Sequence, residues 1–351
     1  MIYINGRFLT QPMTGVERYA YSICRALITL RQPYVIVCPK APIHSCYDTT
    51  GMQILHYGFG KSHLWEQCVL PFFFVGKKNY IVLSFTGLGS IMIRNKIMTI
   101  HDLSFLYNRS WFSKAYYWWY KLMTPLAVRT SKSIITVSQF SKQEILRFYP
   151  FVQEEKVNVI YCGIDNDRFY RQEDTAPADS HYVLAVSSLD PRKNFPMLIR
   201  AFKGIKDSQL YIVGKYNHVF SQQTDSGAES ENIRFLGRVS DEELLTLYNQ
   251  AECLIFPSIY EGFGLPLLEA MACGCPVLAS DIPVFKEICG DAAIYFNPHD
   301  HQNIHEVIKL YLSTPAQQKE IMREKGFQVI KRFSWTDSAK RIIQLTNMYI
   351  K

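Results

Sequence analysis

The hydrophobic pattern of this chain alternates between two kinds of segment along its whole length. Short runs of consecutive apolar residues are separated by stretches in which apolar residues recur at helical spacing. Because the short runs are apolar at nearly every position, they are typical of parallel strands buried on both faces. The expected strands are 2–5, 34–38, 53–56, 81–85, 97–101, 134–137 and 157–162, followed by 182–187, 210–213, 233–236, 253–256, 276–279 and 294–296.

Helical patterns fill the intervals between these runs. Clear examples are 141–148, 197–205, 241–251 and 302–312. Alternating strands and helices are typical of doubly wound sheets with helices on both faces. We therefore predict an α/β protein of two Rossmann-like domains that face each other across a cleft.

The length of the chain, 351 residues, also fits two domains. The segment 171–180 is polar, contains Pro177 and lacks apolar periodicity, which is typical of a linker. We therefore expect an N-terminal domain over 1–172 and a second domain over 181–335.

Composition indicates the cellular compartment in which the protein is expected. No apolar stretch approaches the ~18 residues that a membrane-spanning helix needs, and the first residues read as a strand rather than a signal peptide. The nine cysteines are scattered, and the closest pair, Cys273 and Cys275, lacks partners at zinc spacing. We expect reduced thiols, no metal and a cytoplasmic protein.

Charge is distributed unevenly. Residues 1–174 carry a net charge of +9 and residues 175–351 one of −2, which together give the overall +7. A basic first half indicates an acidic partner, either a membrane surface or a phosphate-bearing substrate. No nucleic-acid-binding signature is present, so nucleic acid is not an expected partner. The aromatic and basic segment 111–132 either rests on a membrane or packs into the first domain.

The segment 258–270, Ser-Ile-Tyr-Glu-Gly-Phe-Gly-Leu-Pro-Leu-Leu-Glu-Ala, carries the most specific chemistry. A buried strand precedes it, and Pro266 suits the first turn of a helix. Amides of the glycine-rich loop at the start of that helix can bind an anion. Glu261 and Glu269, separated by seven residues, can accept hydrogen bonds from hydroxyls. This combination predicts a site for a nucleotide-sugar.

This E-x7-E pattern with its Glu-Gly-Phe-Gly core resembles the retaining glycosyltransferases of family 4, which have the GT-B fold. The flanking segments 235–244 and 272–283 also resemble that family. The resemblance implies transfer of a hexosyl unit from a nucleotide-diphosphate sugar with retention at the anomeric carbon. It implies neither a metal nor another cofactor, and it places the C-terminal helix, at about 336–351, on the N-terminal domain.

The resemblance also assigns roles around the motif. Glu269 is expected to bind ribose hydroxyls, and Glu261 the sugar hydroxyls with help from the loop amides. The donor-binding residues expected here are Glu261, Gly262, Phe263, Gly264, Leu265 and Glu269.

Arg192 and Lys193 follow the expected strand 182–187, at the end of the sheet where open α/β proteins bind ligands. Adjacent Arg and Lys can clamp a pyrophosphate. In the family such a pair does the work of a magnesium ion on the leaving diphosphate. Relatives often have an arginine where this chain has Ser188. The alternative to a diphosphate clamp is that Arg192 and Lys193 are a solvated pair in a turn.

Two further candidates lie in the first half. Gly15, in the loop 12–19, permits close backbone approach and resembles the family's loop over the donor phosphates; a helix cap at Thr14 is the alternative. His101 resembles the histidine that contacts the donor sugar near its 6-position, with Asp102 as a possible orienting group; a structural histidine is the alternative. The expected catalytic residues are thus His101, Glu261, Arg192 and Lys193.

The loop sequences look most like those of bacterial enzymes that build surface polysaccharides, either O-antigen of lipopolysaccharide or capsule. We expect a mannosyltransferase that uses GDP-mannose and a lipid-linked glycan acceptor, peripheral on the cytoplasmic face of the inner membrane. A UDP-hexose is the competing donor. A nucleotide-sugar 2-epimerase, a phosphorylase and a noncatalytic nucleotide-sugar-binding protein are the competing functions; a dinucleotide oxidoreductase lacks its G-x-G-x-x-G.

Overall fold

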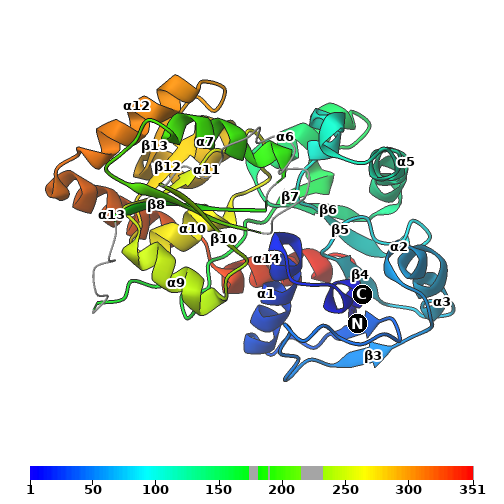
Figure 1. Cartoon of the computed structure of the whole chain (residues 1–351). Helices are drawn as coiled ribbons and strands as arrows, with labels where there is room; N and C mark the ends of the chain where they lie inside the picture. The colour runs from blue at the N-terminus through cyan, green and yellow to red at the C-terminus, as the bar shows by residue number, and fades with distance from the viewer. Residues whose placement is uncertain (174–180, 189, 215–231, 351) are drawn as a thin grey trace. The chain divides into compact units, whose positions relative to one another are not determined.

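The computed structural model describes residues 1–173, 181–188, 190–214 and 232–350, which divide into two compact units (Figure 1). The first comprises Met1–Gly163 with Ser334–Lys351, and the second Ile164–Phe333. The predicted boundary after residue 172 is therefore several residues too late. Arg168 pairs with Asp241 at 3.1 Å, and the backbone N–H of Gln172 donates to Asn249 at 2.8 Å, which anchors this segment in the second unit. Residues 174–180 of the predicted linker lie outside the described residues.

The first unit contains a seven-stranded parallel sheet in the order β3-β2-β1-β4-β5-β6-β7. Its strands are β1 Ile2–Asn5, β2 Val35–Cys38, β3 Ile54–His56, β4 Ile81–Ser84, β5 Lys96–Ile100, β6 Ser133–Thr136 and β7 Val157–Val159. Each strand predicted here is present. The largest difference is at β7, which ends at Val159 rather than 162 because the chain leaves the unit at Gly163.

Helices connect these strands and cover the sheet (Figure 1). They are α1 Gly15–Thr29, α2 Ser62–Leu64, α3 Leu70–Phe73, α4 Ser104–Tyr107, α5 Lys114–Thr130, α6 Gln139–Phe148 and α14 Trp335–Asn347. The C-terminal α14, red in Figure 1, packs against α1. Its apolar positions Ala339 and Ile342 are fully buried, and the Ser338 hydroxyl donates to the Tyr161 carbonyl at 2.7 Å.

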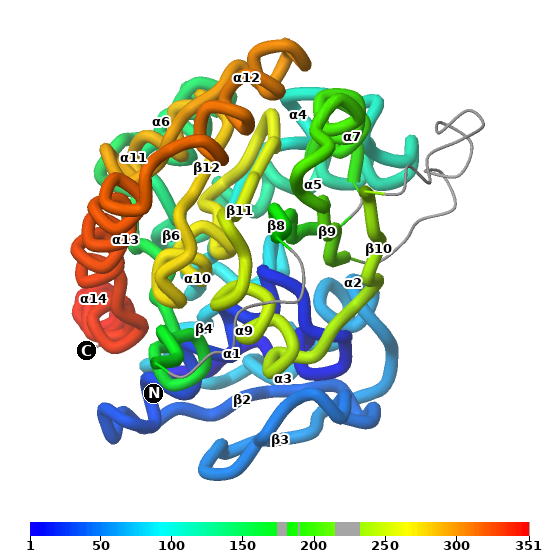
Figure 2. Tube along the Cα trace, turned by 60° about the vertical axis from the view of Figure 1, so that its left-hand side comes forward, coloured from blue at the N-terminus to red at the C-terminus, as the bar shows by residue number. Residues whose placement is uncertain are grey.

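The second unit contains a six-stranded parallel sheet in the order β10-β9-β8-β11-β12-β13, most of which can be followed across Figure 2. Its strands are β8 Tyr182–Val186, β9 Gln209–Val213, β10 Ile233–Gly237, β11 Cys253–Phe256, β12 Val277–Ser280 and β13 Ala293–Phe296. Its helices include α7 Phe195–Phe202, α9 Asp241–Gln250, α10 Leu265–Ala272, α11 Pro283–Cys289, α12 His301–Leu312 and α13 Ala316–Ile330. The core forms where α7 and α12 pack together over the sheet.

The strand order of each sheet reverses direction once, between β1 and β4 in the first unit and between β8 and β11 in the second. Open α/β sheets bind ligands beyond the carboxyl ends of their strands at such a reversal. The loops after these four strands are therefore where functional side chains are expected. Within the described ranges, no helix is both long and apolar enough to cross a membrane.

Candidate active site

The loop after β8 positions the two predicted cations. Asp190 caps a short 3₁₀ turn, Pro191–Lys193, by accepting from the Arg192 N–H at 3.1 Å. Asn194 then adopts a left-handed conformation, φ 58°, that starts α7. The Arg192 carbonyl accepts from the Ile259 N–H at 2.9 Å, so this loop is tied to the loop after β11.

Glu261, in the loop after β11, forms charge pairs with the loop after β8. Its carboxylate accepts a hydrogen bond from the Lys193 ammonium and lies 4.0 Å from the Arg192 guanidinium. Lys193 and Glu261 are only 8% and 7% exposed. Burial lowers the pKa of Lys193, while the Glu261 carboxylate opposes that shift. The structure thus places three of the predicted residues in one cluster of charges, across 68 positions of sequence.

The glycine-rich loop leads directly into α10. Gly264 has φ 111°, and a Cβ there would approach the Leu267 side chain to 2.9 Å, so only glycine fits without strain. Pro266 lies in the first turn of α10, as predicted. Gly262 and Phe263 are buried, and Leu265 is half-buried.

Glu269 lies on α10 and is nearly buried. It accepts a hydrogen bond from the Tyr248 hydroxyl of α9 at 3.1 Å. Burial, with the Glu269 charge close by, raises the pKa of Tyr248 well above its usual range, so the phenol stays protonated and donates. The sequence did not predict Tyr248 as part of this site because nothing in the local pattern sets it apart from the other apolar positions of α9.

In the first unit, His101 follows β5. Its Nε2 donates to the Phe85 carbonyl at 2.7 Å, and the Tyr19 ring meets the imidazole edge-on at 4.9 Å. Burial lowers the pKa of His101, so the imidazole is neutral near pH 7 and its Nδ1 is a hydrogen-bond acceptor. The Asp102 carboxylate accepts from the Ser104 N–H at 2.9 Å and from its hydroxyl at 2.6 Å.

Gly15 is the first residue of α1. A Cβ at this position would meet nothing within 4 Å among the described residues, so the fold of the first unit does not itself require glycine here. Thr14 precedes the helix, but its hydroxyl donates to the Glu17 carboxylate and makes no hydrogen bond with a helix N–H.

A bound metal ion would need several suitable ligands in one place. In the part of the chain that the structure describes, no three His, Cys, Asp or Glu side chains are grouped so that they could hold one.

Two parallel-sheet Rossmann-like units are the architecture of the GT-B glycosyltransferases, and the family matches identify that class of protein. Residues 166–346, more than half of the chain, match the family described as glycosyl transferases group 1, and residues 13–168 match Glycosyltransferase Family 4. The chain belongs to the glycosyl transferases group 1. This confirms the family and the fold class predicted from the sequence.

Curated relatives include O-antigen chain mannosyltransferases. The chain is 36% identical over 223 residues to O-antigen chain mannosyltransferase RfbU of Salmonella typhimurium, covering 62% of this chain and 61% of that protein. It is 28% identical over 276 residues to O-antigen chain mannosyltransferase B of Escherichia coli, covering 72% and 70%. The aligned region thus spans less than two thirds of the Salmonella relative.

Solved structures share the fold over almost the whole chain. WaaG, a glycosyltransferase involved in lipopolysaccharide biosynthesis, superposes with a TM-score of 0.76 at 15% identity and covers 99% of both chains. Anabaena HepE in complex with UDP-glucose gives 0.76 at 18% identity, again over 99% of both chains. At these identities the similarity establishes the GT-B fold alone.

Proposed function

We propose that this protein transfers a hexosyl unit from a nucleotide-diphosphate sugar to a lipid-linked glycan during assembly of a bacterial surface polysaccharide. Membership of the glycosyl transferases group 1 supports the reaction class. The O-antigen mannosyltransferases among the relatives support mannose as the sugar and O-antigen as the product. GDP-mannose is the donor that we propose, with a UDP-hexose as the competitor.

The cluster of Arg192, Lys193 and Glu261 at the β8–β11 reversal is the observation that carries this proposal. We assign the two cations to the donor diphosphate. In the structure, Glu261 is the counter-ion of Lys193. A bound diphosphate takes over that role and leaves the Glu261 carboxylate to accept from sugar hydroxyls. Exchange of one anionic partner for another keeps the buried ammonium paired throughout.

We assign the remaining donor contacts residue by residue. Glu269, held by Tyr248, accepts from the ribose hydroxyls. The loop Gly262–Gly264, whose turn requires glycine at 264, approaches the sugar through its backbone. His101, neutral and with Nδ1 as acceptor, receives a hydroxyl of the donor sugar, and Gly15 leaves space beside the phosphates.

The reaction proceeds with retention and without a covalent nucleophile. The acceptor hydroxyl attacks on the face that the diphosphate leaves, its proton passes to a phosphate oxygen, and the anomeric carbon–oxygen bond to the diphosphate breaks. Arg192 and Lys193 stabilise the charge that develops on the leaving diphosphate, so no divalent cation is needed. Activity should therefore persist in excess EDTA; abolition by EDTA and recovery with Mg²⁺ or Mn²⁺ would contradict this clamp.

We also propose that the first unit binds the surface of anionic membranes, where a lipid-linked acceptor resides. Helix α5 buries Met123, Ala127 and Val128, whereas Trp118 and Leu122 are 56% and 66% exposed. Lys114, Lys121 and Arg129 are exposed on the same helix. Exposed Trp and Leu beside basic residues are typical of helices that lie at membrane interfaces.

A thermal-shift screen with GDP-, UDP-, ADP- and CDP-sugars tests the donor assignment. At a hundredfold excess over its Kd, the true donor should stabilise the protein by about 2.7 kcal/mol. Preference for a UDP-hexose would replace GDP-mannose, while absence of stabilisation by every nucleotide-sugar would contradict the proposed function. Conversion of the donor sugar without any glycan would identify an epimerase instead.

A further inference from the structure

A cavity of about 140 Å³ lies in the first unit beside His101, beyond the carboxyl ends of β4 and β5. Apolar groups such as Leu88 and Phe105 form much of its wall. Tyr116 and Tyr120 of α5 close it, and their rings stack with centroids 4.4 Å apart. Ligand sites typically combine such an apolar lining with a few placed polar groups.

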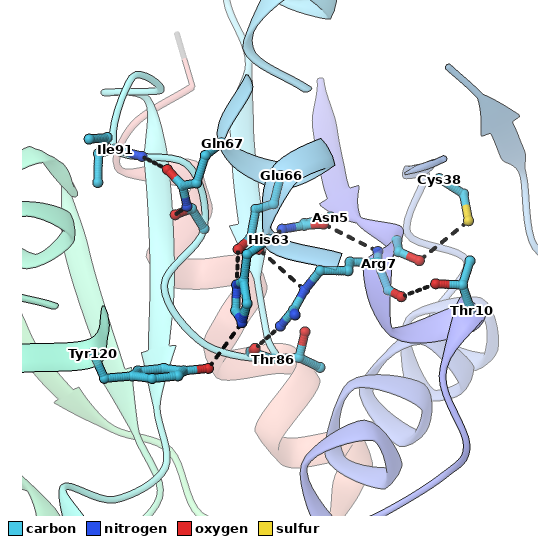
Figure 3. A network of polar contacts seen from close by, with 12 residues as sticks. Asn5, Arg7, Thr10, Cys38, His63, Glu66, Gln67, Thr86, Ile91 and Tyr120 are labelled. Atoms are coloured by element: carbon cyan, nitrogen blue, oxygen red, sulfur yellow. Dashed lines mark hydrogen bonds and ion pairs between the residues drawn. The ribbon is translucent and has the colours of Figure 1, made fainter. Parts of the chain in front are cut away.

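A chain of polar side chains, drawn in Figure 3, connects two residues of the cavity lining, Thr86 and Tyr120. At one end, the Arg7 guanidinium donates to the carbonyl of Thr86, a cavity residue, at 2.8 Å. At the other end, the hydroxyl of Tyr120 lies 3.5 Å from His63 Nε2. Glu66 joins the two ends, because its carboxylate lies 3.6 Å from Arg7 Nε and 3.4 Å from His63 Nδ1.

The Glu66 carboxylate is ionised although it is only 1% exposed. Burial acts to raise its pKa, but Arg7, His63 and the Asn5 amide, which donates at 2.6 Å, together hold the pKa of Glu66 below its usual range. A buried charge is costly unless it is paired and hydrogen-bonded. The first unit thus maintains a buried anion that is linked to the cavity lining through Arg7 and His63.

This anion orients the His63 ring that leads to the cavity. An ionised carboxylate only accepts, so the Nδ1 of His63 carries a proton and donates to Glu66. The Nε2 of His63 then faces the Tyr120 hydroxyl, 3.5 Å away. Burial raises the pKa of Tyr120, which keeps the phenol protonated. His63 thus helps to hold the Tyr120 hydroxyl in place at the cavity, where it can form a hydrogen bond with a ligand.

We propose that the cavity is a subsite for a pyranose ring of the glycan acceptor, and that the Tyr120 hydroxyl forms a hydrogen bond with one of the hydroxyls of that ring. The inference rests on the proposed function, which supplies the acceptor. A sugar ring matches this lining, since its C–H faces pack on tyrosine rings while its hydroxyls donate to placed oxygens. His63 and Glu66 are positioning residues that act through Tyr120.

Substitution of Tyr120 by Phe removes the hydroxyl and keeps the ring. With a methyl hexopyranoside as soluble acceptor, Tyr120→Phe should raise the acceptor KM about tenfold, the usual effect of one lost hydrogen bond. The donor KM should not change. Tyr117→Phe, on the same helix but outside the cavity lining, is the matched control. An unchanged acceptor KM in Tyr120→Phe, or an equal rise in Tyr117→Phe, would overturn the assignment.

The positioning role of His63 predicts non-additivity. His63→Ala should raise the acceptor KM in the wild type but have little further effect in Tyr120→Phe, because its partner hydroxyl is already absent. A purely structural contribution of His63 would instead change the donor KM and the acceptor KM alike in both backgrounds. That outcome would overturn the polar chain as a positioning device.

Binding measured separately from turnover distinguishes failure of this inference from failure of the proposed function. Saturation-transfer NMR should detect methyl α-D-mannopyranoside or another methyl hexopyranoside on the wild type, and Val16→Phe, which fills the cavity from its half-buried rim, should abolish the signal. If nucleotide-sugars bind but no hexopyranoside does, this subsite is wrong and the donor site stands. If no nucleotide-sugar binds or turns over, the proposed function fails, and with it the acceptor role of the cavity.

Discussion

At the scale of single residues, the candidate donor site depends on carboxylates whose partners come from distant parts of the chain. Glu269 is held by Tyr248, and Glu261 by Lys193. Tyr248 and Lys193 each fix the orientation of a carboxylate that, in our proposal, accepts a hydrogen bond from a hydroxyl of the donor. These contacts orient the two carboxylates of the proposed donor site.

Glu269→Ala should weaken donor binding while the fold survives. Loss of a charge-assisted hydrogen bond to a ribose hydroxyl costs roughly 1.5–3 kcal/mol, which is about tenfold to a hundredfold in Kd. Calorimetric titration with the free nucleoside diphosphate measures this loss. Glu306→Ala, an exposed carboxylate on α12 of the same unit, is the control and should bind like the wild type. Unchanged affinity in Glu269→Ala would remove Glu269 from the ribose site.

At the scale of secondary-structure elements, β5 carries an unusual residue at its first position. Lys96 is fully buried, and its Nζ donates to the Thr130 hydroxyl at 2.7 Å and to the Ile93 carbonyl at 3.2 Å. Burial, with Lys156 nearby, lowers the pKa of Lys96 from 10.5 to about 7. This strand therefore contains a group whose charge state changes near neutral pH.

The depressed pKa of Lys96 predicts a pH-dependent stability. Between about pH 7 and 10.5 the unfolded chain binds one more proton at this site than the folded chain, so the free energy of unfolding rises with pH across that window. The contribution is on the order of 5 kcal/mol over the whole interval. In Lys96→Met this rise should disappear, and the variant should be more stable than the wild type below about pH 7. Urea unfolding of both proteins at about pH 6 and about pH 9 is the measurement; parallel pH profiles would contradict the assignment.

Helix α5 shows a division of roles along one element. Its small and aliphatic positions face the core, and several aromatic and basic side chains face solvent. The sequence left two interpretations of 111–132: that it rests on a membrane, or that it packs into the first domain. The second describes the buried positions of α5. The exposed positions are those on which the membrane proposal depends.

Reversal of the exposed charges of α5 should weaken membrane binding. Each basic residue near an anionic surface contributes about 1 kcal/mol, so the change of Lys114, Lys121 and Arg129 to Glu should reduce co-sedimentation with anionic liposomes more than tenfold. Binding by the wild type should require anionic lipid and decrease with salt. Reversal of Lys203, Lys206 and Lys309, exposed in the second unit, is the matched control. Equal binding to neutral and anionic vesicles would count against the proposal.

At the scale of the whole molecule, the chain passes from the first unit to the second at Gly163 and returns at Ser334. The return brings the start of α14 very close to the exit. A Cβ on Gly163 would lie 2.2 Å from the backbone nitrogen of Trp335. Glycine at this position is what allows the C-terminal helix to complete the first unit.

Gly163→Ala should therefore destabilise the first unit. The atoms that the Cβ would meet are backbone atoms of Ser334 and Trp335 and the Cγ of Trp335, none of which is the end of a flexible side chain. Overpacking of this kind typically costs about 1–3 kcal/mol. Denaturant unfolding monitored by tryptophan fluorescence measures the effect. Gly15→Ala, where a Cβ meets nothing within 4 Å, is the control for a glycine substitution in the same unit. Equal stability of Gly163→Ala and the wild type would contradict this account of the crossing.

The sequence by itself determined the features that depend on neighbouring residues. The strands of parallel sheets are buried on both faces, so runs that are apolar at nearly every position indicated such strands. The Gly264–Pro266 pattern indicated the turn into α10, because backbone dihedral angles depend on the local residues. The family followed from the same local motif. The exact unit boundary did not, because residues 164–173 are assigned by contacts with α9 rather than by their own composition.

Only the tertiary structure decided which side chains become partners. Tyr248 meets Glu269, Lys193 meets Glu261, and His63 connects Glu66 to Tyr120, in each case through packing of separate elements. Periodicity shows that such positions are buried, but hydrogen bonds and charge pairs depend on distances that the fold creates. For the same reason the cavity beside His101 has no signature in the sequence, since its walls come from α1, β5, α5 and the loop after β4.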